Sequence, residues 1–188
     1  VVVVLDRSMN VLAETRLAGQ SVSRISIHHD NTRVAIARGG RTRFDPVTDL
    51  AIVWDWRRDE VVTTLDEVAS IVEFDPTSDL LAGVRMNGAS PVVWNARTGE
   101  RLVELTGHAG LVGELRFGSD GSVIVSASDD RTARLWNPTT GEQLDVLRTD
   151  AAVGVVAIDA SSSVVATQDE TGVIRIWALV LDELVDVA

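Results

Sequence analysis

Thr132-Ala133-Arg134-Leu135-Trp136 is a short run of β-branched and apolar residues that ends in tryptophan. Similar runs return at intervals of 40 to 42 residues: Ala51 to Trp54, Pro91 to Trp94 and Val173 to Trp177. A fixed period near 40 residues indicates one supersecondary unit that is repeated. Such a unit buries its hydrophobic face only by stacking on its neighbours. A repeat architecture is therefore the first prediction from this chain.

The block around Trp136 shows the order of strands and turns within one unit. Residues 111–117 alternate between apolar and polar as a strand does, 118–121 are turn residues, and 122–128 read as a second strand. A tight turn leads into the strand that ends at Trp136, and residues 137–141 turn the chain into a fourth strand. Four strands with short turns predict a blade of a β-propeller.

The same pattern divides the whole chain. We expect an all-β fold of four-stranded antiparallel blades, with a partial blade at 1–18, blades at 19–66, 67–107 and 108–149, a last blade at 150–178, and a tail at 179–188. The tail fits a short amphipathic helix or a last outer strand. A small closed ring would leave Val1 to Leu5 unpaired, so we expect an arc of about four to five blades from a larger ring.

Composition excludes several classes of function. The chain of 188 residues has no Cys, which excludes disulfides and cysteine metal sites, and its 17 cationic side chains are all Arg, which excludes a P-loop or Schiff-base lysine. The net charge of −11 opposes binding to nucleic acid. Apolar runs are too short to span a bilayer, which needs about 20 residues.

The absence of Lys suggests high-GC codon usage in the source of this chain. The chain opens at Val1 without a Met, which is compatible with a targeting segment upstream.

These motifs resemble the WD-repeat β-propeller family, most closely in the block that contains Trp136. The resemblance rests on the segments Gly107-His108, Gly118 to Gly121, Ser126 to Asp130, and Leu135-Trp136-Asn137. It implies a hydrogen-bonded network inside this blade, made by His108, Ser126 or Ser128, Asp130 and Trp136. A buried indole N–H needs an acceptor, and an Asp that accepts from His fixes the imidazole tautomer.

The other blades depart from the family pattern. Gln20 and Asp150 stand where His is expected, and Gly88 and Thr171 occupy the place of Asp130. The sequence therefore predicts the blade spacing at Trp54, Trp94 and Trp177, but little of the network.

Two basic clusters are candidates for partner binding. Trp56, Arg57 and Arg58 fall outside the repeat register, and Trp and Arg are enriched at binding hot spots. The alternative is a Trp folded over its own blade with Arg stacked on it. Arg41, Arg43 and Phe44 lie in a loop that is longer in the first block than elsewhere, which is either a binding loop or a harmless insertion. A basic cluster on an acidic chain favours an acidic protein or peptide partner.

Catalytic and metal-binding motifs fit poorly. His28-His29-Asp30 reads as a turn, because adjacent strand residues point to opposite faces and do not easily ligate one ion. A triad of Ser126, His108 and Asp130 would be buried beneath Trp136, away from substrate. The acidic pairs Asp129-Asp130 and Asp169-Glu170 lack calcium-loop spacing. We expect no catalytic residue, metal or cofactor.

The resemblance implies a noncatalytic protein–protein interaction scaffold, part of a larger WD-repeat propeller in a cytoplasmic signalling or regulatory protein. An alternative is a sensory or regulatory module of a multidomain effector, such as a kinase, a protease-like protein or a transcriptional regulator. This arrangement resembles WD-repeat arrays of bacteria, and we expect a bacterial source. A propeller enzyme is the third alternative, and three His without Cys count against it.

Overall fold

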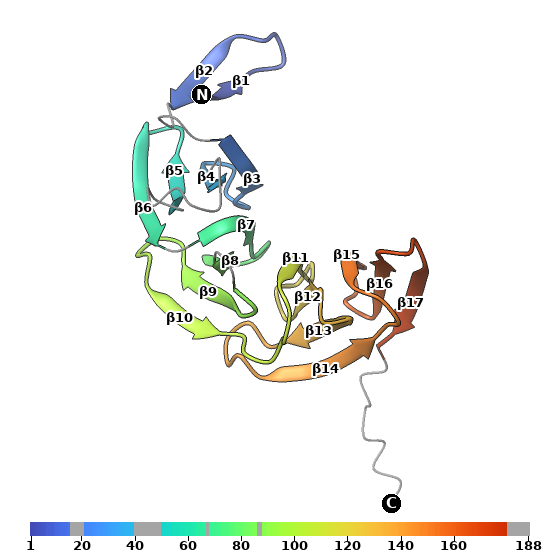
Figure 1. Ribbon diagram of the computed structural model, residues 1–188. Helices are drawn as coiled ribbons and strands as arrows, with labels where there is room; N and C mark the ends of the chain where they lie inside the picture. Colours follow the sequence, from blue (N-terminus) through green and yellow to red (C-terminus); the bar gives the residue numbers. More distant parts are fainter. Residues whose placement is uncertain (16–20, 40–49, 67, 86–87, 180–188) are drawn as a thin grey trace, which may run out of the picture.

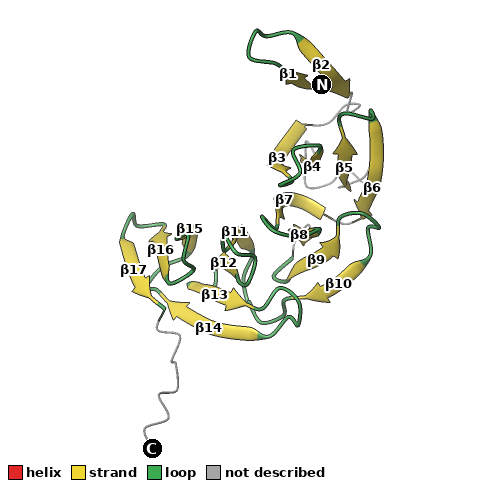
Figure 2. Ribbon diagram, turned by 180° about the vertical axis from the view of Figure 1, so that it is seen from behind, coloured by secondary structure: helices red, strands yellow, loops and turns green. Residues whose placement is uncertain are grey.

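A computed structural model describes residues 1–15, 21–39, 50–66, 68–85 and 88–179. The described residues form seventeen β-strands and no helix, as Figure 2 shows. The prediction of an all-β fold built from four-stranded antiparallel sheets is confirmed. The tail, for which the sequence predicts either a short helix or a last outer strand, falls on residues 180–188 outside the described ranges.

Seventeen strands form one hairpin and four sheets, and neighbours within each sheet are consecutive along the chain. The hairpin pairs β1 (Val2–Leu5) with β2 (Val11–Thr15). The four sheets are β3 (Ser21–Ile27), β4 (Arg33–Gly39), β5 (Leu50–Asp55) and β6 (Glu60–Asp66); β7 (Val68–Phe74), β8 (Leu80–Arg85), β9 (Pro91–Asn95) and β10 (Arg101–Glu104); β11 (Val112–Phe117), β12 (Ile124–Ser128), β13 (Thr132–Trp136) and β14 (Gln143–Arg148); and β15 (Val153–Ile158), β16 (Val164–Asp169) and β17 (Ile174–Ala178).

Asparagine and glycine shape the turns that follow two of the repeat tryptophans. Asn137 Oδ1 accepts the backbone N–H groups of Thr139 and Thr140 at 2.9 and 3.0 Å, and Gly141 adopts a φ of 75°. Asn95 makes the same turn, and Gly99 has a φ of 73°. An Asx turn closed by a left-handed glycine directs the chain from the third strand into the fourth.

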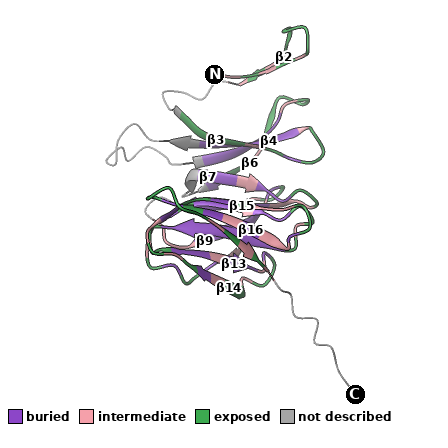
Figure 3. Ribbon diagram, turned by 90° about the vertical axis from the view of Figure 1, so that its right-hand side faces the viewer, coloured by how far each residue is buried: buried purple, intermediate pink, exposed green. Residues whose placement is uncertain are grey.

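Figure 1 shows the sheets standing side by side along an open arc. The first strand of each sheet (β3, β7, β11, β15) lies toward the hollow of the arc, and β6, β10 and β14 lie on its outer side (Figure 1). Neighbouring sheets are therefore stacked face to face. Figure 3 shows that the buried residues lie within this stack.

Each repeat tryptophan packs against the preceding sheet. Trp94 belongs to the apolar cluster shared with β3–β6, Trp136 to the cluster shared with β7–β10, and Trp177 packs against the cluster shared with β11–β14. Trp54 packs in the same way toward β1 and β2. The 40-residue period thus places one large side chain in every interface between neighbouring sheets.

Both ends of the arc present exposed apolar side chains. Ile174 and Ile176 on β17 are 65% and 67% exposed. In the preceding sheet, Ala133 and Leu135 hold the equivalent positions relative to the repeat tryptophan, and they are buried in the cluster shared with the last sheet. Toward the other end, where the sheet β3–β6 faces the two-stranded hairpin β1–β2, Ile25 and Ile27 on β3 are also exposed. The two terminal faces have the chemistry of interfaces between sheets.

Candidate functional site

A buried hydrogen-bonded relay runs through the sheet β11–β14. The Trp136 indole Nε1–H donates to Ser126 Oγ at 2.8 Å, and Ser126 Oγ lies 2.7 Å from His108 Nε2. His108 Nδ1 lies 2.9 Å from Asp130 Oδ2. The structure brings these four predicted residues together, whereas Ser128 Oγ accepts the N–H of Asp130 in the adjoining turn.

The protonation states of the relay follow from burial and hydrogen bonding. Burial lowers the pKa of His108 and outweighs the opposing effect of Asp130, so the imidazole is neutral at pH 7. Its Nδ1–H then donates to Asp130, and Nε2 accepts from the Ser126 hydroxyl. Burial raises the pKa of Asp130, but hydrogen bonds from Thr132, Ala109 and His108 lower it to about 2. The Ser126 side chain is fully buried, which fits a structural role.

The last sheet replaces the relay with different side chains. Trp177 Nε1–H donates to Thr167 Oγ1 at 3.0 Å, and Thr167 precedes its Trp by ten positions, as Ser126 does. Arg175 donates to Asp169 at 2.6 Å and to Asp150 at 2.5 Å. Sequence reasoning missed this substitute, and the hydroxyl residue ten positions before Trp was the available signal.

Trp54 and Trp94 have no equivalent of the Ser126 hydroxyl. Ser126 pairs across the sheet with the residue two positions before Trp136, and the residues that pair in this way in the first two four-stranded sheets are Ile36 and Gly83. Trp54 Nε1–H donates instead to Asp59 in the following turn, at 3.3 Å.

The turn Trp56-Arg57-Arg58 lies on the rim where β5 leads into β6. The Trp56 indole N–H donates to the carbonyl oxygen of Asn31 at 3.0 Å, and the Arg57 guanidinium lies 5.0 Å from the Trp56 ring centroid. Trp56 is therefore folded over its own sheet, with Arg57 stacked on it. Asp55 Oδ1 accepts the backbone N–H groups of Arg57 and Arg58, and Arg58 Nε lies 3.8 Å from Asp55 Oδ2. Both arginine residues are exposed. The second cluster, Arg41, Arg43 and Phe44, lies outside the described residues.

A charged cluster joins the sheet β3–β6 to the sheet β7–β10 on the same rim. His28 is 1% exposed and lies in the turn after β3; its Nδ1 accepts the N–H of Asp30, and its Nε2 lies 3.2 Å from the carbonyl oxygen of Ser78. Burial lowers the pKa of His28, so the ring is neutral at pH 7. Arg33 contacts Asp30 at 2.8 Å and Asp79 at 2.6 Å. Sequence reasoning missed this cluster.

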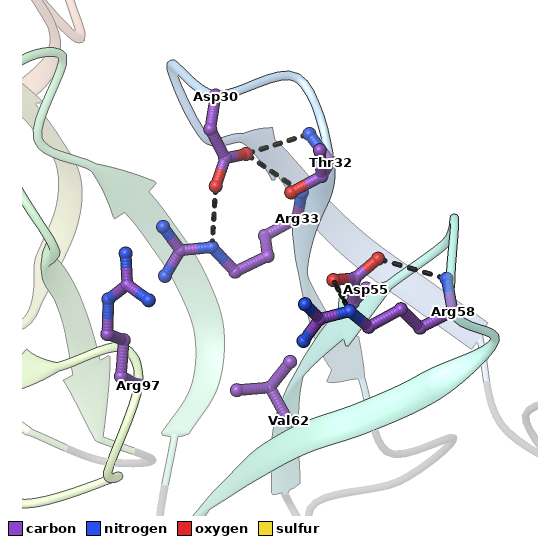
Figure 4. A pocket seen from close by; sticks show the side chains of 7 residues that line it. All are labelled: Asp30, Thr32, Arg33, Asp55, Arg58, Val62 and Arg97. Atoms are coloured by element: carbon purple, nitrogen blue, oxygen red, sulfur yellow. Dashed lines mark hydrogen bonds and ion pairs between the residues drawn. The ribbon is translucent and has the colours of Figure 1, made fainter.

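A pocket of about 250 Å³ opens beside this cluster (Figure 4). Its lining comes from both sheets and consists of Asp30, Thr32, Arg33, Asp55, Arg58, Val62 and Arg97. The pocket is therefore lined by three arginine side chains. Within the described ranges, no group of three or more His, Cys, Asp or Glu side chains has metal-binding geometry. The described residues also contain no helix long and apolar enough to cross a membrane.

Residues 99–137 match the family model of the WD domain, G-beta repeat. The matched segment contains β10 to β13, so it begins one strand before the sheet it largely covers. This match, the sheet architecture and the relatives described next support a WD-repeat family for this chain.

Three curated proteins illustrate the similarity. Periodic tryptophan protein 2 homolog of Neurospora crassa is 30% identical over 111 residues, 58% of this chain and 12% of that protein. Apoptotic protease-activating factor 1 of Rattus norvegicus is 29% identical over 140 residues, 73% of this chain and 11% of that protein. Eukaryotic translation initiation factor 3 subunit I of Danio rerio is 32% identical over 94 residues, 50% of this chain and 29% of that protein. The chain spans less than a third of each relative.

Among solved structures, the crystal structure of the computationally designed Ika4 protein matches with a TM-score of 0.72. The alignment covers 89% of this chain and 97% of that one at 18% identity. At this identity, the similarity concerns the fold alone.

Proposed function

We propose that this chain is a noncatalytic protein–protein interaction scaffold, part of a larger WD-repeat propeller in a cytoplasmic signalling or regulatory protein. Residues 1–188 form one propeller fragment in this proposal, with the blade boundaries predicted from the sequence. The stacked sheets hold their turns at fixed positions on two rims, and partners dock on these turns. We also infer a bacterial source from the resemblance to WD-repeat arrays of bacteria, and the all-arginine cation content fits the high-GC codon usage of such a source. The three relatives described above are eukaryotic.

The observation that carries the proposal is the exposed pair Arg57 and Arg58 on a rim turn. Asp55 fixes the backbone of this turn, and Trp56 anchors it to the sheet, so both cations have a rigid base. Two exposed cations on a held turn of a chain with net charge −11 favour an acidic protein partner over a nucleic acid. A preorganised turn also reduces the entropy that binding costs.

A regulatory module within a multidomain effector is the second candidate. Its support is the similarity to apoptotic protease-activating factor 1, in which the matched region is 11% of a protein named for activating a protease. In this arrangement, the sheets would sense a partner and the effector would lie elsewhere in the same protein.

The test compares partner capture by the wild-type chain with capture by two charge-reversal variants, Arg57→Glu/Arg58→Glu and Arg41→Glu/Arg43→Glu. Crosslinking followed by quantitative mass spectrometry measures the captured proteins. We expect Arg57→Glu/Arg58→Glu to lose specific partners while its melting temperature stays within a few degrees of wild type, and the second variant shows whether the loop that contains Arg41 and Arg43 also contributes. Unchanged capture by Arg57→Glu/Arg58→Glu would contradict the rim-turn proposal, and a stoichiometric bound metal in the purified protein would contradict the noncatalytic role.

A further inference from the structure

We propose that the pocket between the sheets β3–β6 and β7–β10 binds an oxyanion, a carboxylate or a phosphate monoester carried by a side chain of a protein partner. This inference rests on the proposed function for one point only, namely that the anion belongs to a protein partner. The pocket chemistry stands on its own geometry.

Three turns supply the three arginines of the pocket. Arg33 follows the turn between β3 and β4, Arg58 lies in the turn between β5 and β6, and Arg97 lies in the turn between β9 and β10. Figure 4 shows the guanidinium groups of Arg33 and Arg97 pointing toward each other, with Arg58 approaching beside Val62. Asp79 lies between Arg33 and Arg97 and contacts both guanidinium groups, at 2.6 and 2.5 Å. One carboxylate shared by two guanidinium groups leaves N–H donors of both groups available to a second anion.

Arg33 has an unused donor at the base of this pocket. Its Nε–H donates to Asp30 at 2.8 Å, and its Nη2 group lies 2.6 Å from Asp79 and 3.1 Å from the His28 ring nitrogens. Its Nη1 group is buried without a hydrogen-bond partner among the described residues, and the side chain is only 6% exposed. A buried N–H without an acceptor costs about 1–3 kcal/mol, so the site favours a ligand oxygen.

Arg58 and Arg97 lie at the mouth of the pocket with most of their donors available. Arg97 contacts Asp79 through Nε at 2.5 Å, and Arg58 Nε lies 3.8 Å from Asp55. The Arg97 side chain is 64% exposed and the Arg58 side chain is 77% exposed. The planar guanidinium fork matches the oxygens of carboxylate and phosphate groups, which are its strongest bidentate partners.

The carboxylates of the pocket are already engaged, which argues against a cation. Burial raises the pKa of Asp79, but hydrogen bonds from Arg97 and Arg33 outweigh it and lower the pKa, so Asp79 is ionised. Its Oδ2 accepts from Arg97, whereas its Oδ1 forms an ion pair with Arg33 at 2.6 Å but has no hydrogen-bond partner among the described residues. Asp79 does not line the pocket. Asp30 is held in the same state by Thr32 and Arg33. Asp55 Oδ1 accepts two backbone N–H groups. The remaining hydrogen-bonding capacity of the pocket therefore consists mainly of donors.

The first experiment uses inorganic phosphate as the probe, so it tests the pocket without any partner. Phosphate binding to the 188-residue chain is measured by calorimetry and by chemical-shift changes in the Arg side-chain signals. We expect saturable binding that Arg58→Gln and Arg97→Gln each weaken about tenfold. Arg101→Gln, an exposed arginine on β10 outside the pocket, is the matched control and should bind as wild type does.

A second experiment distinguishes the two sources of the anion. Peptides of one sequence carry phosphoserine, glutamate or serine at the same position, and each is titrated into wild type and the three variants. Binding of the phosphoserine peptide alone identifies phosphate, and binding of the glutamate peptide as well identifies a general oxyanion site. Both results support the proposal if Arg58→Gln and Arg97→Gln weaken them and Arg101→Gln does not. Absence of saturable binding to every probe, or equal affinity in all variants, would overturn it, and the rim-turn scaffold would remain to be judged by its own capture experiment.

Discussion

At the scale of single residues, the Ser126 hydroxyl joins two buried side chains of the relay. Its hydroxyl accepts from Trp136 and donates to His108 in a fully buried position. Removing it leaves the indole N–H and an imidazole nitrogen without partners. We expect Ser126→Ala to lower the free energy of unfolding by about 1–3 kcal/mol. Urea unfolding measures this loss, and Thr139→Ala in an exposed turn should change stability by less than about 0.5 kcal/mol. Equal effects would mean that the relay does not stabilise the sheet.

Protonation of buried histidines predicts a pH dependence. Burial lowers the pKa values of both His28 and His108 in the folded chain. Below the unfolded-state pKa of about 6.5, the unfolded chain binds more protons than the folded chain does. The stabilisation that comes from keeping the two histidines neutral is therefore fully present above about pH 6.5. It is lost as the pH falls through the lowered pKa values that His28 and His108 have in the folded chain.

The corresponding measurement is the free energy of unfolding between pH 8 and pH 5. We expect it to decrease toward pH 5, and we expect the decrease to be shallower in His108→Gln, which keeps the slope contributed by His28. The comparison uses slopes, because the substitution also changes the absolute stability. A variant with the wild-type slope would show that His108 is not neutral in the folded chain.

At the scale of elements, the turns that follow Trp94 and Trp136 contact the preceding sheet. Gly99 has a φ of 73°, and a Cβ at this position would collide with Thr63 on β6. We expect Gly99→Ala to destabilise the chain by about 1–2 kcal/mol, because it combines backbone strain with steric conflict. Gly113→Ala on β11 is the control, since its Cβ would enter open space. Thermal unfolding of the two variants checks this, and equal melting temperatures would contradict the turn-to-sheet contact.

The sequence predicted the strands well because alternation and turn residues are local signals. Ile124 to Ser128 and Thr132 to Trp136 are recognised from their own residues, and the Trp period adds the blade spacing. The cluster of His28, Arg33 and Asp79 was not predictable in this way, because it joins turns of two sheets about 50 positions apart. The orientation of Trp56 likewise depends on a carbonyl oxygen 25 residues earlier.

At the scale of the whole molecule, polar side chains link three sheets across the hollow side of the arc. Arg24 on β3 contacts Glu114 on β11 at 3.1 Å, and Arg116 contacts Glu114 at 2.6 Å and Glu73 on β7 at 3.5 Å. Together with the apolar clusters, these contacts fix the relative positions of the sheets. Rim turns on such a frame keep a constant geometry for a partner.

The open arc of stacked sheets ends in exposed apolar faces, and we predict that these faces receive further blades. Sedimentation velocity over a range of concentrations tests it most directly, because exposed apolar faces associate when no blade covers them. We predict that wild type self-associates, that Ile174→Glu/Ile176→Glu is monomeric with an unchanged circular dichroism spectrum, and that Leu144→Glu on the outer strand β14 behaves as wild type does. A wild-type chain that stays monomeric at high concentration, or association that the double variant does not reduce, would contradict the claim.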